Sequence, residues 1–220
     1  MAFYKFMNSK HLESFLDGGI YCQPLSYYQR HEAQGSVGDK HEAMRIFAPS
    51  GGLEIHNITT NTRFTLPAAF LSELVANEIY VFCVSLRDAD PTTIDKYYDT
   101  TVHIQNVRKF TRRLRTAVQS LSGDMVLLSR PVSYYGVADP PDVNWALPDV
   151  IATSKRTCFA SQVEHRFAIA SRKLMKIGSA IQKIQFGELV HDKETPISNP
   201  TIVNVGDMRD ICYAVSRPGA

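Results

Sequence analysis

The segment SQVEHRFAIAS, from Ser161 to Ser171, decides how this chain folds. Apolar residues alternate with other residues along it, and this period of two predicts a half-buried β-strand. One face of that strand carries the polar side chains of Gln162, Glu164 and Arg166. The other face carries Val163, His165 and Phe167. A strand that enters a core with an amide and a carboxylate on one face suggests that these two groups have a chemical role.

The segments around this strand predict a strand-rich α+β protein. EIYVFCVSL (residues 78–86) is the most convincing buried strand. FYKF (3–6) and IYCQPL (20–25) are expected as strands, separated by a helix over 8–19 in which Ser9 is the N-cap. DMVLLSRPVSYYG (124–136) reads as one long strand, or as two that join at Pro131. We therefore expect a single domain over residues 1–220, with two or three helices.

Composition sets the class of protein and its compartment. The 220 residues are 44% hydrophobic and 21% charged, which suits one globular core. No apolar run reaches the roughly 18 residues of a membrane span, and no signal-peptide pattern opens the chain, so we expect a soluble, cytoplasmic protein with no membrane partner. The cysteines are expected as buried, reduced thiols, with no disulfide framework and no structural zinc: Cys22, Cys83, Cys158 and Cys212.

A basic amphipathic helix is predicted over residues 106–121, NVRKFTRRLRTAVQSL. Its apolar stripe has helical spacing: Val107, Phe110, Leu114, Val118 and Leu121. Its cations are not interrupted by any acid: Arg108, Lys109, Arg112, Arg113 and Arg115. Such a patch predicts contact with the phosphates of DNA or RNA. The alternative is a solvated helix face whose acidic partners lie elsewhere.

The polar segment RHEAQGSVGDKHE (30–42) carries a second cluster of charged groups. Its candidate ligands for a divalent metal, which would serve phosphodiester hydrolysis, are His31, Glu32, Asp39, His41 and Glu42. Gly35 and Gly38 argue against one continuous helix that would align them. The alternatives are a solvated loop, or a loop that shapes the mouth of a substrate site.

The N-terminal strand, helix and strand bring aromatic and cationic groups together. Tyr4, Lys5 and Tyr21 could supply a nucleotide with ring faces and a positive charge. The alternative is that the aromatic side chains belong to the core or its rim and that Lys5 is a solvated charge.

Three blocks of the sequence resemble a known family. Residues 3–44, YVFCVSL (80–86) and FASQVEHRFAI (159–169) look like the successive blocks of the domain of unknown function 2971 family. That family consists mostly of uncharacterised bacterial and phage proteins. The resemblance covers about 170 of the 220 residues.

The opening FYKF…HLESFLDGGIY is similar to the first strand, helix and second strand of ADP-ribosyltransferases. That resemblance implies an ADP-ribosyltransferase-like split β-sheet, NAD as co-substrate and no metal. In those enzymes a later strand carries a Glu two residues after a Gln or Glu, and Gln162-Val163-Glu164 reads as this motif. Lys5 stands where the family has His or Arg, and Ser85 lacks the flanking Ser-Thr-Ser pattern.

The resemblance implies a role for each of these residues. Glu164 would stabilise the cationic sugar formed as nicotinamide leaves, and Gln162 would position the acceptor nucleophile. Contacts to NAD would come from Tyr4, Lys5, Tyr21, Tyr28, Arg30 and Ser85. The alternative for Glu164 is an ion pair with Arg166 or Lys155 at a sheet edge.

The sequence therefore predicts an NAD-dependent ADP-ribosyltransferase. Its acceptor would be a macromolecule, nucleic acid slightly favoured over protein. The resemblance suggests a toxin or an effector in conflict between phage and host, with a possible antitoxin or regulatory partner. Two rival hypotheses are a metal-dependent nuclease built on residues 31–42 and a non-catalytic nucleic-acid-binding module built on the basic helix.

Overall fold

The computed structural model describes residues 2–30, 39–86, 98–176, 181–187 (backbone alone) and 198–216. Its largest sheet has eight strands. Six of them follow the order β14 (Thr201–Asn204), β2 (Gly19–Pro24), β7 (Tyr80–Ser85), β1 (Phe3–Met7), β8 (Thr100–Ile104) and β15 (Cys212–Ser216). β12 (Glu164–Ser171) pairs with β7 and with β9 (Met125–Pro131). The fold is α+β, with 25% helix and 41% strand, and the large sheet is antiparallel, which confirms the predicted class.

Strand β7 is the hub of this sheet, and its two edges differ. On one edge β12 pairs with it from Glu164↔Ser85 to Ile169↔Tyr80. The other edge is divided between two strands: β2 pairs with it at Val81 and Tyr80, and β1 pairs with it only at Tyr4↔Ser85. The sheet therefore splits along β7. The Nζ atom of Lys5 lies in the split and donates a hydrogen bond to the carbonyl of Cys83, at 3.0 Å.

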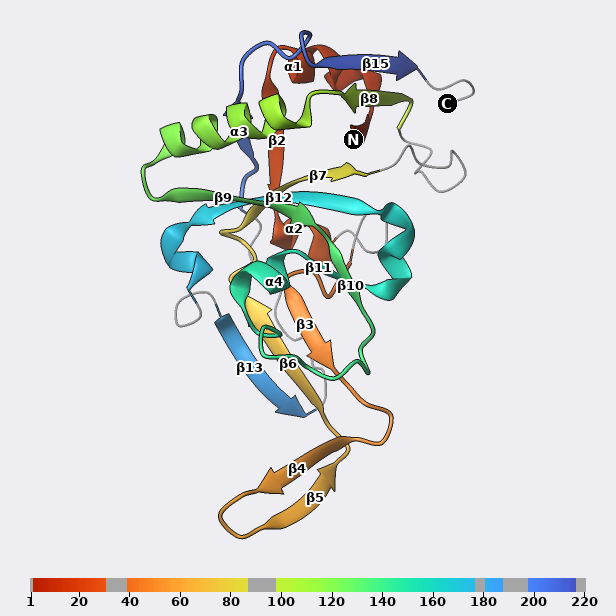
Figure 1. Cartoon of the computed structure of the whole chain (residues 1–220), viewed down its shortest axis with the longest axis vertical. Coiled ribbons are helices and arrows are strands. Elements are labelled where there is room, and N and C mark those ends of the chain that lie inside the picture. Colours follow the sequence, from red (N-terminus) through yellow and green to blue (C-terminus); the bar gives the residue numbers. More distant parts are fainter. Residues whose placement is uncertain (1, 31–38, 87–97, 177–180, 188–197, 217–220) are drawn as a thin grey trace.

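Helix α3 (Val107–Leu121) covers one face of the large sheet, as Figure 1 shows. The predicted stripe is correct, since Phe110, Leu114 and Val118 are its buried residues. They pack with Phe82 and Phe167 in the main core. The side chain of Asn106 accepts a hydrogen bond from the Lys109 N–H and caps the helix. We call this face of the sheet the α3 face.

Smaller elements cover the opposite face. These are α2 (Leu25–Arg30), α4 (Pro148–Ala152) and a three-stranded sheet of β13 (Ile181–Gly187), β6 (Ala69–Leu74) and β3 (Met44–Phe47). Ala168 and Ala170 of β12 pack there against Leu25 and Ile151. β12 is therefore buried on both faces, and the prediction of a half-buried strand was wrong. The sequence shows only one apolar face because the other is filled by alanine and by paired charges.

Several local predictions are confirmed or corrected. The segment 124–136 forms two strands: β9 ends at Pro131, and β10 (Ser133–Tyr135) pairs in parallel with β11 (Ser154–Arg156). A 3-10 turn, η1 (Ser9–His11), precedes α1 (Leu12–Leu16), and its cap is Asn8 instead of Ser9. β4 (Leu53–Asn57) and β5 (Thr62–Leu66) form a hairpin at the end of the molecule far from α3 (Figure 1).

The cysteines and the helices bear on the predicted compartment. All four cysteines are free, and burial raises the pKa of Cys22 and of Cys83 to about 12. Cys158 is exposed, so the prediction that every thiol is buried was wrong there; it lies in the surface turn η3 (Thr157–Gln162). Among the described residues, no helix combines the length and the apolar character that crossing a membrane would need.

Candidate active site

The Gln-x-Glu motif does not lie on one strand. β12 begins at Glu164, and Gln162 is the last residue of η3. Val163 between them has a left-handed backbone, with φ of 42°. The predicted shared face of Gln162 and Glu164 was therefore wrong, because the chain turns at Val163. Gln162 still points toward the same neighbours: its Oε1 accepts a hydrogen bond from Lys155 Nζ at 2.8 Å, and its carbonyl accepts one from Ser85 Oγ at 3.1 Å.

Glu164 is buried and held by two cations. Its side chain is 6% exposed. Oε1 accepts a hydrogen bond from Arg166 Nε at 2.9 Å, and Oε2 lies 2.6 Å from Lys155 Nζ. Burial alone would raise the pKa of Glu164, but Arg166 and Lys155 hold it well below its ordinary value. The ion pairs given as the alternative role of Glu164, with Arg166 or with Lys155, both form, in the interior of the sheet and not at its edge, and the carboxylate stays ionised at neutral pH.

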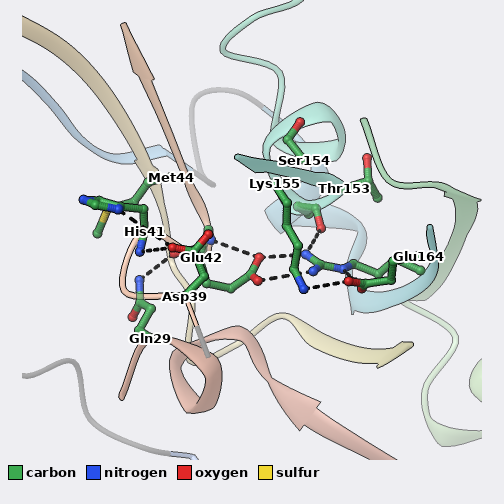
Figure 2. A network of polar contacts seen from close by, with 12 residues as sticks. Gln29, Asp39, His41, Glu42, Met44, Thr153, Ser154, Lys155 and Glu164 are labelled. Atoms are coloured by element: carbon green, nitrogen blue, oxygen red, sulfur yellow. Dashed lines mark hydrogen bonds and ion pairs between the residues drawn. The ribbon is translucent and has the colours of Figure 1, made fainter. Parts of the chain in front are cut away.

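Arg166 is the centre of a buried charge network. Its two carboxylate partners, Glu42 and Glu164, are labelled in Figure 2. Its side chain is 1% exposed, and Glu42 binds it through both carboxylate oxygens, at 2.7 and 3.2 Å. A further N–H donates to the carbonyl of Ala152 at 2.8 Å. The pKa of Arg166 is raised well above its ordinary value: burial opposes the charge, but Glu164 and Glu42 outweigh it. Two carboxylates thus share one buried guanidinium.

The loop before β3 is a structural part of this network. Asp39 and Glu42 are both buried, and Asp39 accepts a hydrogen bond from Arg156 at 2.8 Å. The expectation of a solvated loop was wrong for these two residues, because each carboxylate is matched by an arginine from another element. His41 Nδ1 lies 3.8 Å from Asp39. Within the described ranges no three His, Cys, Asp or Glu residues are placed to hold a metal ion, and His31 and Glu32 lie outside those ranges.

A row of side chains crosses the sheet beside Glu164. Strand register places Glu164 opposite Ser85, and Ser85 opposite Tyr4. Directly opposed residues of an antiparallel pair point to the same face, so these three lie on the face away from α3. The row continues through His103 to Tyr213, whose hydroxyl lies 2.9 Å from His103 Nδ1. No local pattern pointed to His103 or Tyr213, because their alignment with Glu164 depends on strand order.

The other predicted NAD contacts are divided between the two faces. Tyr28 of α2 lies near the network; burial and the charge of Glu164 contribute to a pKa well above its ordinary value. Tyr21 faces the Glu164 side by its register but is half exposed, and Arg30 is exposed at the end of α2. Lys5 points to the α3 face, 5.0 Å from the ring of Phe82, and burial lowers its pKa. The structure brings Tyr4, Ser85 and Tyr28 to Glu164, and it does not bring Lys5 to the same face.

The cations of α3 lie on the opposite face of the sheet and are partly neutralised. Lys109 and Arg113 both pair with Asp210, so the prediction of five uncompensated cations was wrong for these two. Asp210 could not be assigned to them from the sequence because it lies about 100 residues away. Arg108, Arg112 and Arg115 are exposed, at helical spacing along one side of α3, and no ion pair joins them to the described part of the chain.

Three further groups complete the site, and the sequence analysis assigns none of them a role in the NAD reaction. Lys155 connects Glu164 to Gln162, and the Tyr134 hydroxyl accepts a hydrogen bond from the Glu164 backbone N–H at 2.8 Å. Glu42 had been considered only as a metal ligand. The sequence signal for these groups is the number of charged residues around the strand of Glu164 and Arg166. A charge in a buried strand needs a partner of opposite charge.

His165 gives a pH-dependent stability that can be measured. It is buried beside Phe3, and burial lowers its pKa to about 4. Below its ordinary pKa the unfolded chain therefore binds more protons than the native one, and stability falls as the pH drops from 6.5 toward 4. Urea unfolding at pH 7 and pH 5 should show a loss of about 2 kcal/mol that His165→Gln largely removes. His56→Gln, at an exposed position, is the control. If the loss of unfolding free energy between pH 7 and pH 5 is the same in His165→Gln as in the wild type, His165 is not its source.

Comparisons of the chain with protein-family models, with curated proteins and with solved structures found no match.

Proposed function

We propose that this protein is an NAD-dependent ADP-ribosyltransferase that modifies a macromolecular acceptor. The observation that carries the proposal is the row of Tyr4, Ser85 and Glu164 across three neighbouring strands, with a buried and ionised carboxylate at its inner end. A fixed carboxylate beside a hydroxyl, with an aromatic ring on the next strand of the row, suits a sugar that becomes cationic during the reaction.

The proposed reaction breaks the bond between the nicotinamide nitrogen and carbon 1 of its ribose. The electron pair leaves with nicotinamide, and positive charge develops on the ribose. Glu164 stabilises this charge, and a nucleophile of the acceptor then bonds to the same carbon and loses its proton. Gln162, tied to Lys155 beside Glu164, is the candidate to position that nucleophile. Because Arg166 and Lys155 already hold the carboxylate, it needs no reorganisation during the reaction.

The cations around Glu164 do not cancel its role in this proposal. Arg166 is bound by Glu42 as well as by Glu164, so its charge is shared between two carboxylates. The formal charges of four side chains in the network sum to zero: Glu42, Glu164, Lys155 and Arg166. A positive charge on the sugar beside Glu164 would be attracted by that carboxylate.

Binding of NAD is proposed on the face away from α3. Tyr4 and Tyr28 are the candidates to stack on nicotinamide, and Tyr21 and Ser85 lie on the same side. Arg30 is preferred to Lys5 for the pyrophosphate, since α2 covers this face and Lys5 points to the other. The acceptor, nucleic acid or protein, would approach the same face. The arginines of α3 lie on the opposite face of the sheet, so they would not hold the acceptor at Glu164.

Amide chemical-shift mapping during an NAD titration tests the proposed site. The largest shifts are expected at Tyr4, Ser85 and Glu164. Arg108 and Arg115, on the far face, are internal controls and should not move. Shifts confined to α3, or no shifts at NAD concentrations of about 10 mM, above the typical KM range, would refute the site.

A further inference from the structure

A groove runs between α3 and the edge strand β14. It is lined from the helix by Arg112, Arg113 and Leu121, and from the strand by Ile202 and Asn204. β14 pairs with β2 and ends the order of the large sheet within the described ranges, so its outer edge has no partner strand there. An edge strand offers unpaired N–H and C=O groups to an added strand. The groove thus has a hydrogen-bonding strand edge on one side and a cationic helix on the other.

The groove also exposes aliphatic side chains. Ile202 is 63% exposed and Leu121 is 48% exposed. Exposing two large aliphatic side chains to water in one groove is unfavourable, which suggests that a partner makes an apolar contact there. No aromatic ring of the described residues lines the groove, whereas binding of single-stranded nucleic acid commonly relies on bases stacking on aromatic side chains. The combination suits an extended peptide better than a polynucleotide.

The charge of the groove indicates which peptide it would take. Arg108, Arg112 and Arg115 project from α3 without ion pairs in the described ranges, and α3 itself contains no acidic residue. Arg113 is already bound by Asp210. The net positive charge along the rim complements carboxylates, which arginine binds through two hydrogen bonds.

We infer that this groove binds an acidic, extended segment of a partner protein, which adds as a strand to the free edge of β14. Its aliphatic side chains contact Leu121 and Ile202, and its carboxylates pair with Arg112 and its neighbours. The helix side of the groove lies on the face opposite Glu164, whereas register sets Ile202 opposite Tyr21, on the Glu164 side of the sheet edge. The inferred contacts use none of the side chains assigned to NAD. The inference therefore does not depend on the proposed NAD chemistry, and either can fail without the other.

Selection from a phage-displayed library of random dodecapeptides tests the inference. Enriched peptides should alternate aliphatic and acidic residues, and amides of Ile202–Asn204 should become protected from hydrogen exchange when such a peptide binds. Arg112→Glu and Ile202→Asp should each weaken binding about tenfold or more. Ile58→Asp is the matched control, since Ile58 is 85% exposed and lies in the distant β4–β5 hairpin (Figure 1).

Two results would overturn the inference. One is a selection with no enrichment of acidic, alternating peptides on the wild-type chain. The other is an oligothymidylate that binds the groove, with an affinity lost in Arg112→Glu and unchanged in Ile202→Asp. That second outcome would assign the arginines of α3 to nucleic acid, as their sequence suggests.

Discussion

Glu164→Gln is expected to slow nicotinamide release from NAD by at least about 100-fold, because the neutral amide cannot stabilise the cationic sugar. The same change removes the partner of Lys155 and one of the two partners of Arg166, so it also lowers stability. The rate must therefore be measured with labelled NAD at a temperature where circular dichroism shows the variant folded.

Glu42→Gln is the matched control for that experiment. It removes the other carboxylate from Arg166 and leaves the ion pairs of Glu164 in place. A folded Glu42→Gln protein should lose less NAD turnover than Glu164→Gln, because Glu164 keeps its charge although Arg166 then pairs with it more strongly. Glu164→Asp adds a second test, since it keeps the charge but withdraws the carboxylate, and such a displacement costs on the order of 100-fold in rate. Wild-type turnover in both variants of Glu164 would remove this residue from the reaction.

Glu42→Gln is expected to destabilise the fold by about 3–5 kcal/mol, the cost of breaking a buried ion pair by removing one partner. Arg166 is 1% exposed, and among the described residues it would retain Glu164 alone as an ion-pair partner. Urea unfolding measures the change directly. Asp210→Asn is a useful comparison, because it removes a carboxylate from two exposed ion pairs on α3, which water and salt screen, and it should destabilise the fold far less. Equal losses of unfolding free energy in Glu42→Gln and Asp210→Asn would show that burial does not strengthen the ion pairs of Arg166.

The parts of the fold that depend on local sequence were predictable. β7, the strand after Glu164 and the apolar stripe of α3 all follow from the spacing of apolar residues. The turn at Val163 was not predictable, because a left-handed valine has no sequence signal. Its consequence is that Gln162 reaches the site from a turn and not from the strand.

The site itself could be predicted only in part. Glu164 was identified from its motif, and Lys155 and Arg166 were foreseen as its alternative partners. The pairing of Glu42 with Arg166 joins residues 124 positions apart, and strand order alone aligns Tyr4, Ser85 and His103. The alignment of Tyr4 with Ser85 depends on how β1 and β2 divide one edge of β7. Local sequence patterns do not encode such strand pairings.

Release of labelled nicotinamide by the purified wild-type chain tests the central claim most directly. Incubation with NAD in the presence of a chelator, with water as the acceptor of the ADP-ribose, should release nicotinamide in excess of the protein, because every group assigned to the reaction is a side chain of the chain itself. Absence of release would contradict the claim, as would release that requires a divalent metal. Metal-dependent cleavage of a nucleic acid without consumption of NAD would instead identify a nuclease.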